Sequence, residues 1–362
     1  MRNASSKLKS LLLTAMVIGL MSVSSFGAEE KSWKEETVLI SPQGDQTVVR
    51  SFEGDKTLFK NADPQLAIEW GLANARTTVV LAGKYVVSDA IDIPRDDVTL
   101  IIDKGAEISL NPETEHTSPT PGFRGRDGKF YPVKVLIYNH GRNNVRVMHF
   151  GTGVGGSFPV MFDGRNEKRT CGIEGGLLLF AGSAKQCSWL IDSRGVQVPL
   201  VSMDAGLDAV LALEGCEDCK LGTIVNLASE AGGKTGETVD LNSSNRRITI
   251  ERLIGERSQE IIDMNGSHAD VKELVSVGEP QKLLCFTVRA GARFTSRPAC
   301  PDRLDVWKAT VLEDATTSAL RVEVPKLPDA LPRFTVKATV EVTMKDGSKK
   351  EYTKEVVIDV RK

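Results

Sequence analysis

A segment past the middle of the chain repeats itself at a fixed distance. Residues 237–256, ETVDLNSSNRRITIERLIGE, return directly downstream as residues 260–279, EIIDMNGSHADVKELVSVGE. The repeat aligns Asp240 with Asp263 and Ile248 with Val271. A period of this length is typical of a solenoid, because one unit of strands and tight corners cannot bury its apolar face alone. We therefore expect stacked coils of short strands.

Fainter copies of the same corner and strand occur upstream. The matching positions, predicted to point inward, are Val98, Val145, Cys187, Cys219, Ile248 and Val271. One coil per repeat, with insertions at one corner, accounts for their uneven spacing. The insertions cover residues 111–131, 151–175, 196–206 and 229–236, and they are rich in Gly, Pro and charge. If they share one corner they wall a groove, and loops on a rigid scaffold commonly carry function.

The two ends of the repetitive region differ from its middle. Asp63-Pro64 begins an apolar segment, LAIEWGLANA, whose spacing predicts a helix that caps the first coil. From residue 301 the sequence alternates as strands do, with a hairpin signal at Lys345-Asp346-Gly347. We predict a β-helical domain at residues 28–300 and a small C-terminal β domain or end cap at residues 301–362.

Residues 1–28 have the layout of a secretory signal peptide: three cations, an apolar run at 11–21, and small residues at 27 and 28. We predict cleavage of residues 1–27 and a secreted product, extracellular or periplasmic. Export would remove three of the 46 cations and leave 43 against 48 acids, a formal charge of −5. This balance disfavours nucleic acid as a partner, and no later run of about 20 apolar residues predicts a membrane span.

The segment VVLAGKYVVSDAIDIPRDDVTLIIDKGA, with coils of the form ETVDLNSSNRRITIERL, resembles the right-handed parallel β-helix of the pectate-lyase and polygalacturonase superfamily. The likeness covers residues 57–288 and implies an all-β, pectin-lyase-like solenoid. The matching positions are packing and corner residues. The NTDG, GHG and RIK patterns of polygalacturonases and the vWiDH segment of pectate lyases are missing, so the resemblance assigns no catalytic residue and no specific enzyme family.

Carboxylates are duplicated together with the core residues. Strand alternation places Asp240 and Asp263 outward on neighbouring coils. Aligning the upstream coil by its corner adds Asp208 to a column with Glu237 and Glu260. Stacked carboxylates need a cation, a shared proton or solvation. Three interpretations stay open: a Ca²⁺ site at Asp240, Asp263 and Asp208; an acid and base pair of a glycoside hydrolase among Asp240, Asp263, Glu237 and Glu260; or a solvated polar face.

Cations gather in the first two insertions, interleaved with aromatic residues. The candidate substrate-binding residues are Arg124, Arg126, Lys129, Arg165, Lys168 and Arg169. Guanidinium groups bind carboxylate or sulfate, and aromatic rings pack on sugar faces. His140, at a corner near the predicted groove, is a candidate catalytic residue. The alternative is a set of charged loops that keep the protein soluble.

These patterns predict a protein that binds an extracellular, anionic polysaccharide and cleaves it by β-elimination. The alternatives are a glycoside hydrolase that uses the stacked carboxylates, and a non-catalytic adhesin or polysaccharide-binding surface protein. Cofactors are predicted to be none or Ca²⁺. Cys216-x-x-Cys219 lacks the second pair that a zinc site requires, and the spacing alone assigns no disulfide.

Overall fold

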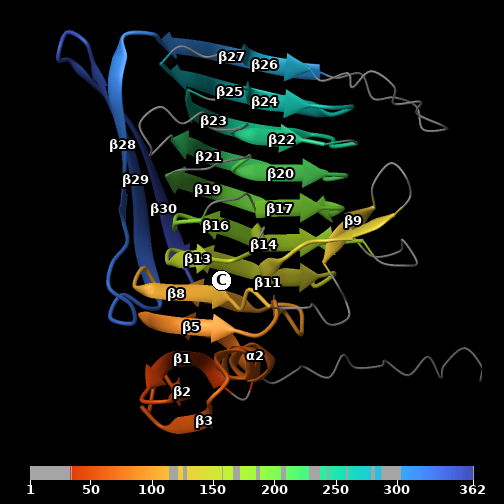
Figure 1. Ribbon diagram of the computed structural model, residues 1–362, viewed down its shortest axis with the longest axis vertical. Coiled ribbons are helices and arrows are strands. Elements are labelled where there is room, and N and C mark those ends of the chain that lie inside the picture. The colour runs from red at the N-terminus through yellow and green to blue at the C-terminus, as the bar shows by residue number, and fades with distance from the viewer. Residues whose placement is uncertain are drawn as a thin grey trace, which may run out of the picture. The chain divides into compact units, whose positions relative to one another are not determined.

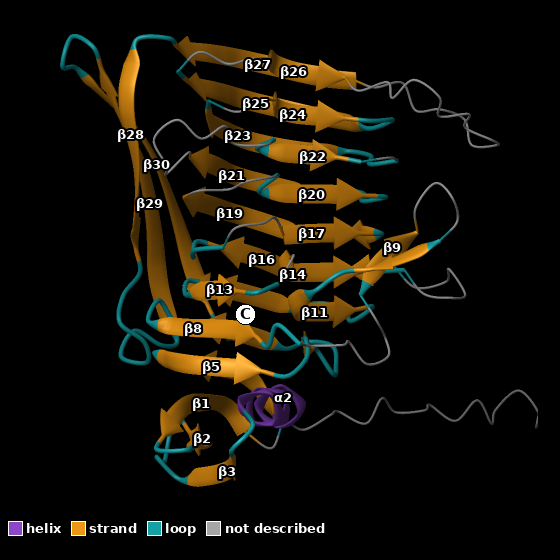
Figure 2. Ribbon diagram, in the orientation of Figure 1, coloured by secondary structure: helices purple, strands orange, loops and turns teal. Residues whose placement is uncertain are grey.

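The computed structural model describes residues 33, 35–113, 121–124, 129–156, 158–165, 172–184, 188–204, 209–227, 237–242, 244–257, 260–278, 282–286 and 303–361. The predicted signal peptide lies outside these ranges. The elements below all belong to one compact unit, Glu35–Lys362. The fold is all-β in its main features, with two large and largely parallel sheets, and the described residues contain one helix, coloured purple in Figure 2.

The unit begins with three strands and that helix. Strand β1 (Glu35–Gln43) pairs antiparallel with β2 (Gln46–Ser51), and β2 pairs antiparallel with β3 (Thr57–Asn61). Helix α2 (Pro64–Asn74) begins where the Asp63 side chain accepts a hydrogen bond from the Gln65 backbone N–H. The helix expected after Asp63-Pro64 is confirmed.

Twelve strands form the larger sheet, in the order β27-β25-β23-β21-β19-β16-β12-β7-β4-β1-β2-β3. From β1 to β27 all neighbours in it are parallel. Its further members are β4 (Ala75–Val80), β7 (Thr99–Ile102), β12 (Arg146–His149), β16 (Leu177–Phe180), β19 (Gln197–Asp204), β21 (Lys220–Leu227), β23 (Ile248–Glu256), β25 (His268–Val277) and β27 (Arg303–Leu312).

Eight parallel strands form the second sheet, in the order β26-β24-β22-β20-β17-β14-β11-β6. They are β6 (Ile91–Asp92), β11 (Val135–His140), β14 (Phe158–Asp163), β17 (Ser188–Ile191), β20 (Leu211–Glu214), β22 (Val239–Leu241), β24 (Glu260–Met264) and β26 (Lys282–Phe286). From β19 to β27 the chain alternates strictly between the two sheets, so consecutive strands stack on those of the preceding pair (Figure 1).

Smaller sheets complete the parallel region. Strands β5 (Gly83–Val87), β8 (Ala106–Leu110) and β13 (Thr152–Val154) form one, and β15 (Ile173–Glu174) pairs with β18 (Ser193–Arg194). The hairpin of β9 (Gly122–Arg124) and β10 (Phe130–Pro132) begins within the first predicted insertion and ends one residue beyond it.

The sequence repeat holds in one sheet and fails in the other. In the eight-stranded sheet Asp240 pairs with Asp263, as the repeat predicts. In the twelve-stranded sheet Ile248 pairs with Ala269 and Ile250 with Val271, so the register is shifted by two positions. The alignment of Ile248 with Val271 was therefore wrong. The cause is the corner, since the path from Leu241 to Ile248 is two residues longer than the equivalent path from Met264 to Ala269.

The inward direction of the repeat positions is a separate prediction, and it holds where the structure describes them. The fully buried members are Val98, Val145, Cys219, Ile248 and Val271. Cys187 lies outside the described residues. A shift by two positions keeps a side chain on the same face of its strand, so Ile248 and Val271 both point inward although they do not pair.

The C-terminal strands form a separate antiparallel sheet. They are β28 (Ala315–Glu323), β29 (Arg333–Met344) and β30 (Lys349–Asp359), and Gly347, with a φ of 81°, lies in the predicted β29–β30 turn. Figure 1 shows these long strands running across the parallel ones. The boundary predicted between residues 300 and 301 precedes β27, yet β27 pairs with β25 along its whole length. The antiparallel strands begin only at Ala315.

This sheet packs on the larger parallel sheet through apolar side chains. One register column of the parallel sheet, Val79, Ile101, Met148, Leu179 and Leu200, meets Phe334, Val336, Ala338, Val356 and Ile358. A second cluster joins Val225, Ile254 and Val275 to Val340 and Val342. The C-terminal sheet therefore covers one outer face of the parallel region.

Candidate functional site

The eight-stranded sheet carries polar and aromatic side chains on the face that points away from the core. One register column contains Asp92, Tyr138, Met161, Trp189, Ala212, Asp240 and Asp263. The residues that alternate with this column along the strands, such as Leu190, Leu213 and Leu241, are fully buried in the core. The alternation of each strand therefore directs the polar set outward.

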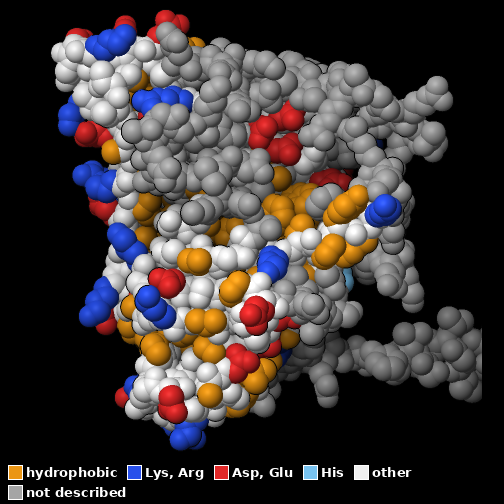
Figure 3. All heavy atoms as spheres, viewed as in Figure 1, with side chains coloured by type: hydrophobic (Ala, Val, Ile, Leu, Met, Phe, Trp, Pro, Cys, Tyr) orange, Lys and Arg blue, Asp and Glu red, His pale blue; other side chains and the backbone are white. Residues whose placement is uncertain are grey.

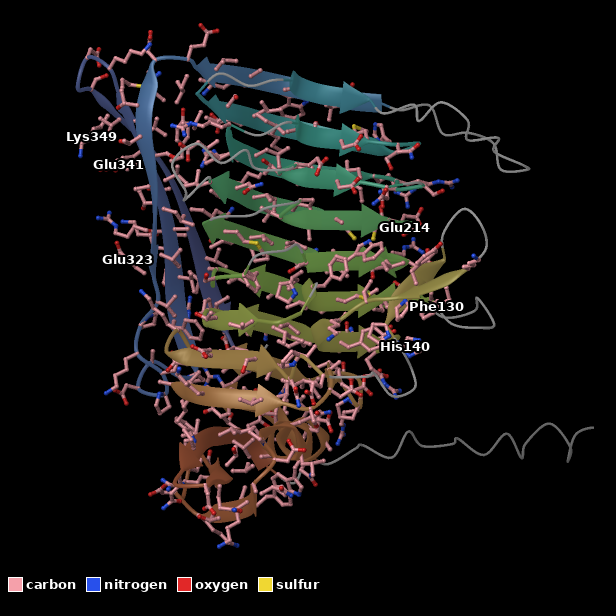
Figure 4. The ribbon with its side chains drawn as sticks, in the orientation of Figure 1. Phe130, His140, Glu214, Glu323, Glu341 and Lys349 are labelled. Carbon is pink, nitrogen blue, oxygen red and sulfur yellow. The ribbon has the colours of Figure 1, made fainter. Side chains whose placement is uncertain are left out.

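A second outward column lies two residues further along the strands. It runs from His140 through Asp163 and Ile191 to Glu214, at the carboxyl ends of β11, β14, β17 and β20. Figure 4 places His140 and Glu214 at the same ends of their strands, on the side where the β9–β10 hairpin carries Phe130. Three of the four strands thus bring a titratable group to one edge.

Asp163 and Arg165 form a bidentate ion pair in this column. Arg165 donates from Nε to Asp163 Oδ1 and from Nη2 to Oδ2, both at 2.8 Å. The Tyr138 hydroxyl donates to the same Oδ2 at 3.3 Å. Asp163 is almost fully buried, whereas the Arg165 side chain is 29% exposed. Paired geometry of this kind holds a guanidinium in one orientation.

His140 lies against the same group. Its Nε2 is 3.0 Å from the carbonyl oxygen of Arg165, and its ring stacks on Tyr138 with centroids 5.5 Å apart. A carbonyl oxygen can only accept, so Nε2 carries a proton, and in the neutral form of the ring Nδ1 has the lone pair.

Aromatic and apolar side chains pack against Arg165. Its guanidinium carbon is 5.9 Å from the centroid of the Trp189 ring, which in turn lies 5.1 Å from Phe158. Trp189 is mostly buried, together with Val135, Met161 and Ala212. In Figure 3 hydrophobic side chains gather in this area and on the hairpin, where Phe130 and Tyr131 are exposed.

Two acids at this edge have raised pKa values. Burial raises the pKa of Glu214, and Asp192 and Asp163 add to the effect, whereas the Arg165 charge opposes it. Burial also raises the pKa of Asp92, against the opposing charges of His140 and Arg142. A carboxyl group that keeps its proton to a higher pH than usual is suited to act as a general acid.

The predicted carboxylate stack occupies the far end of the same face. Asn242 donates to Asp240 Oδ2 at 2.8 Å. Asp263 is buried, and its Oδ1 makes no hydrogen bond within the described residues. Figure 3 shows acidic side chains over this part of the sheet. Glu237 is half-buried and precedes β22.

Calcium ligation stays a prediction. Asp208 and the side chain of Glu260 lie outside the described residues. Among the residues that the structure does describe, no group of three or more His, Cys, Asp or Glu side chains could hold a metal ion.

The predicted basic residues are only partly described. Arg124 belongs to β9, but its side chain, like Arg126, Lys168 and Arg169, lies outside the described set, and Lys129 is exposed. Arg165 is therefore the predicted cation that the structure brings to the cluster.

Sequence reasoning missed Tyr138, Asp163, Trp189 and Glu214. A signal for two of them was present, because Asp163-Gly164 and Glu214-Gly215 each place an acid directly before a glycine where an apolar strand ends.

No helix among the described residues has both the length and the apolar character that crossing a membrane requires.

Comparisons with known proteins add little to this geometry. No family model matches the chain, and no curated protein matches it. Among solved structures the chain is similar to one described as "a putative glycosyl hydrolase" from Parabacteroides merdae, with 12% identity and a TM-score of 0.26, over 68% of this chain and 88% of that one. At this TM-score the likeness assigns neither a family nor a function to the chain.

Proposed function

We propose that this chain is a secreted right-handed parallel β-helix protein of the pectin-lyase-like type that cleaves a polysaccharide on the outer face of its eight-stranded sheet. The strict alternation of the chain between two stacked parallel sheets from β19 to β27 supports the β-helix. The main support for this activity is the position of Glu214. This carboxyl group has a raised pKa and lies on the same face as Asp240, on the neighbouring strand.

Glycoside hydrolysis fits this pair best. Ala212 pairs with Asp240, so Glu214 lies two residues along the neighbouring strand. With strands about 4.8 Å apart and a rise of about 3.3 Å per residue, the two backbones are about 8 Å apart diagonally. Two carboxyl groups on side chains that leave one face at this backbone spacing can reach the separation of about 6.5 to 9.5 Å that suits inversion, in which one acid protonates the leaving oxygen and the other activates water. Glu214 is the proposed acid and Asp240 the proposed base.

The charge of the face favours a neutral substrate over a polyuronate. Among its described residues are the carboxyl groups of Asp92, Asp163, Glu214, Asp240 and Asp263, and Asp163 binds two N–H groups of Arg165. A polyanionic chain would be repelled wherever these groups are ionised, whereas a neutral chain would not.

β-Elimination is the second candidate, and a specific observation favours it. The guanidinium of Arg165 and the Nδ1 lone pair of His140 lie in one cluster, so a cation and a base are both present. Removal of the proton beside a uronate carboxylate requires that pairing.

One assay separates these activities. The protein is incubated with a panel of neutral, uronic-acid and sulfated polysaccharides, and new reducing ends are counted beside the ultraviolet absorbance of unsaturated products. Reducing ends without absorbance support hydrolysis. Equal amounts of reducing ends and unsaturated products would contradict hydrolysis and support β-elimination. Retention on an immobilised polysaccharide without any product would leave a binding protein and overturn both enzymatic proposals.

A further inference from the structure

The corner between β20 and β21 contains two cysteines that the site does not use. The sequence there is Glu214-Gly-Cys216-Glu-Asp-Cys219, and both thiols are fully buried. Gly215 and Asp218 have φ values of 65° and 56°. These two left-handed residues fold the corner so that both cysteines point inward, whereas Glu217 and Asp218 point out and pair with Arg247.

Both sulfur atoms converge on one peptide segment of the preceding coil. The Cys219 thiol donates to the carbonyl oxygen of Ser193 at 3.6 Å. The Cys216 thiol donates to the carbonyl oxygen of Leu190 at 3.3 Å, and its sulfur also meets the Ser193 backbone. The two side chains contact each other as well, which lowers the pKa of Cys219 and raises that of Cys216 beyond the effect of burial.

The position of Cys216 can be compared with the equivalent corner positions of the neighbouring coils. Bridges from Arg194 to Glu217 and from Glu217 to Arg246 place Ser193, Cys216 and Asn245 at equivalent positions. Ser193 and Asn245 bond carbonyl groups of their own corners, as Cys216 does. Serine and asparagine fill the position of Cys216 in the neighbouring coils, so the hydrogen bonds of the corner do not by themselves require a thiol there.

We propose that Cys216 and Cys219 form an intramolecular disulfide that closes this corner. The oxidant is a low-molecular-weight disulfide such as glutathione disulfide. The Cys219 thiolate attacks it and releases one thiol, and the Cys216 sulfur then attacks the mixed disulfide and releases the second. The protein loses two protons and two electrons, and the oxidant becomes two thiols. Because both sulfurs are buried in the native corner, the exchange takes place during folding.

A peptide map tests the bond directly. Trypsin cuts after Arg194 and Lys220, so residues 195–220 form one peptide that contains both cysteines and no other. The full chain is refolded from the reduced state with glutathione and glutathione disulfide, alkylated without reductant, digested and weighed. The expected peptide is unalkylated and lighter than the dithiol by two hydrogen atoms. Two alkyl groups on it, or a mass linking it to another cysteine peptide, overturns the proposal.

The stabilising effect is tested by melting. Closing so short a ring raises the melting temperature by about 3 °C, and reductant should remove that gain. Cys216→Ser keeps the corner hydroxyl seen at Ser193, and Cys219→Val places a branched apolar side chain in a fully buried position; both should melt alike with and without reductant. If the oxidised wild type melts at the same temperature as the reduced wild type, the disulfide does not stabilise the corner and the proposed stabilising role is wrong. This inference does not depend on the proposed polysaccharide activity.

Discussion

The outer faces of the two large parallel sheets differ in composition, although one chain builds both by the same alternation. The twelve-stranded sheet presents the apolar column Val79, Ile101, Met148, Leu179 and Leu200, and the C-terminal strands cover it. The eight-stranded sheet presents His140, Arg165, Glu214 and Asp240, which are half-exposed. An apolar outer face must be buried, whereas a face with polar groups can stay in water and bind a ligand. The difference locates the candidate site.

The largest expected effect concerns the polar face. Glu214→Gln keeps the size of the side chain and removes its proton, so we expect hydrolysis to fall by about 100-fold or more. The rate is measured as new reducing ends on a substrate found by the panel. Glu217→Gln, at the corner outside the face, is the matched control. A Glu214→Gln variant with the wild-type rate would contradict the assignment of the acid.

A large loss of stability is expected on the apolar face. Phe334 is 5% exposed and contacts Phe150 edge-on at 6.1 Å. Phe334→Ala should lower the free energy of unfolding by about 4 kcal/mol, because it leaves a cavity between the two sheets. Urea unfolding measures the loss. Val357→Ala, at a side chain that is 58% exposed on the same antiparallel sheet, should change little. Equal losses in the two variants would contradict the covering role.

The buried side chain of His149 predicts that the stability of the fold depends on pH. His149 is fully buried, stacks on Phe180, and has a pKa lowered to about 4 by burial. Between the unfolded value of about 6.5 and this lower value the unfolded chain binds more protons, so stability falls as pH falls, by on the order of 3 kcal/mol in total. Urea midpoints across this pH range measure the loss. In His149→Phe the loss should shrink, and an unchanged slope would contradict the assignment.

A smaller effect is expected from the ion pair on the polar face. Asp163→Asn removes the charge that Arg165 and Tyr138 bind, and it should lower the free energy of unfolding by about 2 kcal/mol, since Arg165 keeps partial contact with water. Chemical denaturation measures the change. A change near zero would mean that Asp163 does not hold the cluster together.

The smallest effect is expected at the exposed corners. Arg247 pairs with Glu217 and Asp218, but its side chain is 55% exposed. Arg247→Gln should leave the melting temperature within experimental error, because water screens surface ion pairs. A clear drop would show that corner pairs stabilise the fold as much as the Asp163–Arg165 pair of the polar face does.

Part of the fold and little of the site could be predicted. The helix after Asp63, the pairing of Asp240 with Asp263 and the Lys345-Asp346-Gly347 turn follow from local patterns, and the structure confirms them. The site could not be assembled in the same way. His140, Asp163 and Glu214 lie on the separate strands β11, β14 and β20, and the insertions between them break the period on which the alignment depends.

The local sequence is enough to predict short stacked strands and the pairing of Asp240 with Asp263, because the alternation of apolar residues and a regular corner act over a few residues. Three features are visible only in the folded chain: the pairing of Ile248 with Ala269, the extension of the larger sheet to β27, and the outer face that the C-terminal strands cover. These depend on corner lengths and on contacts between segments far apart in the chain, such as Met148 and Phe334. No local pattern carries that information, since burial of an outward residue is set by whatever the rest of the chain places upon it.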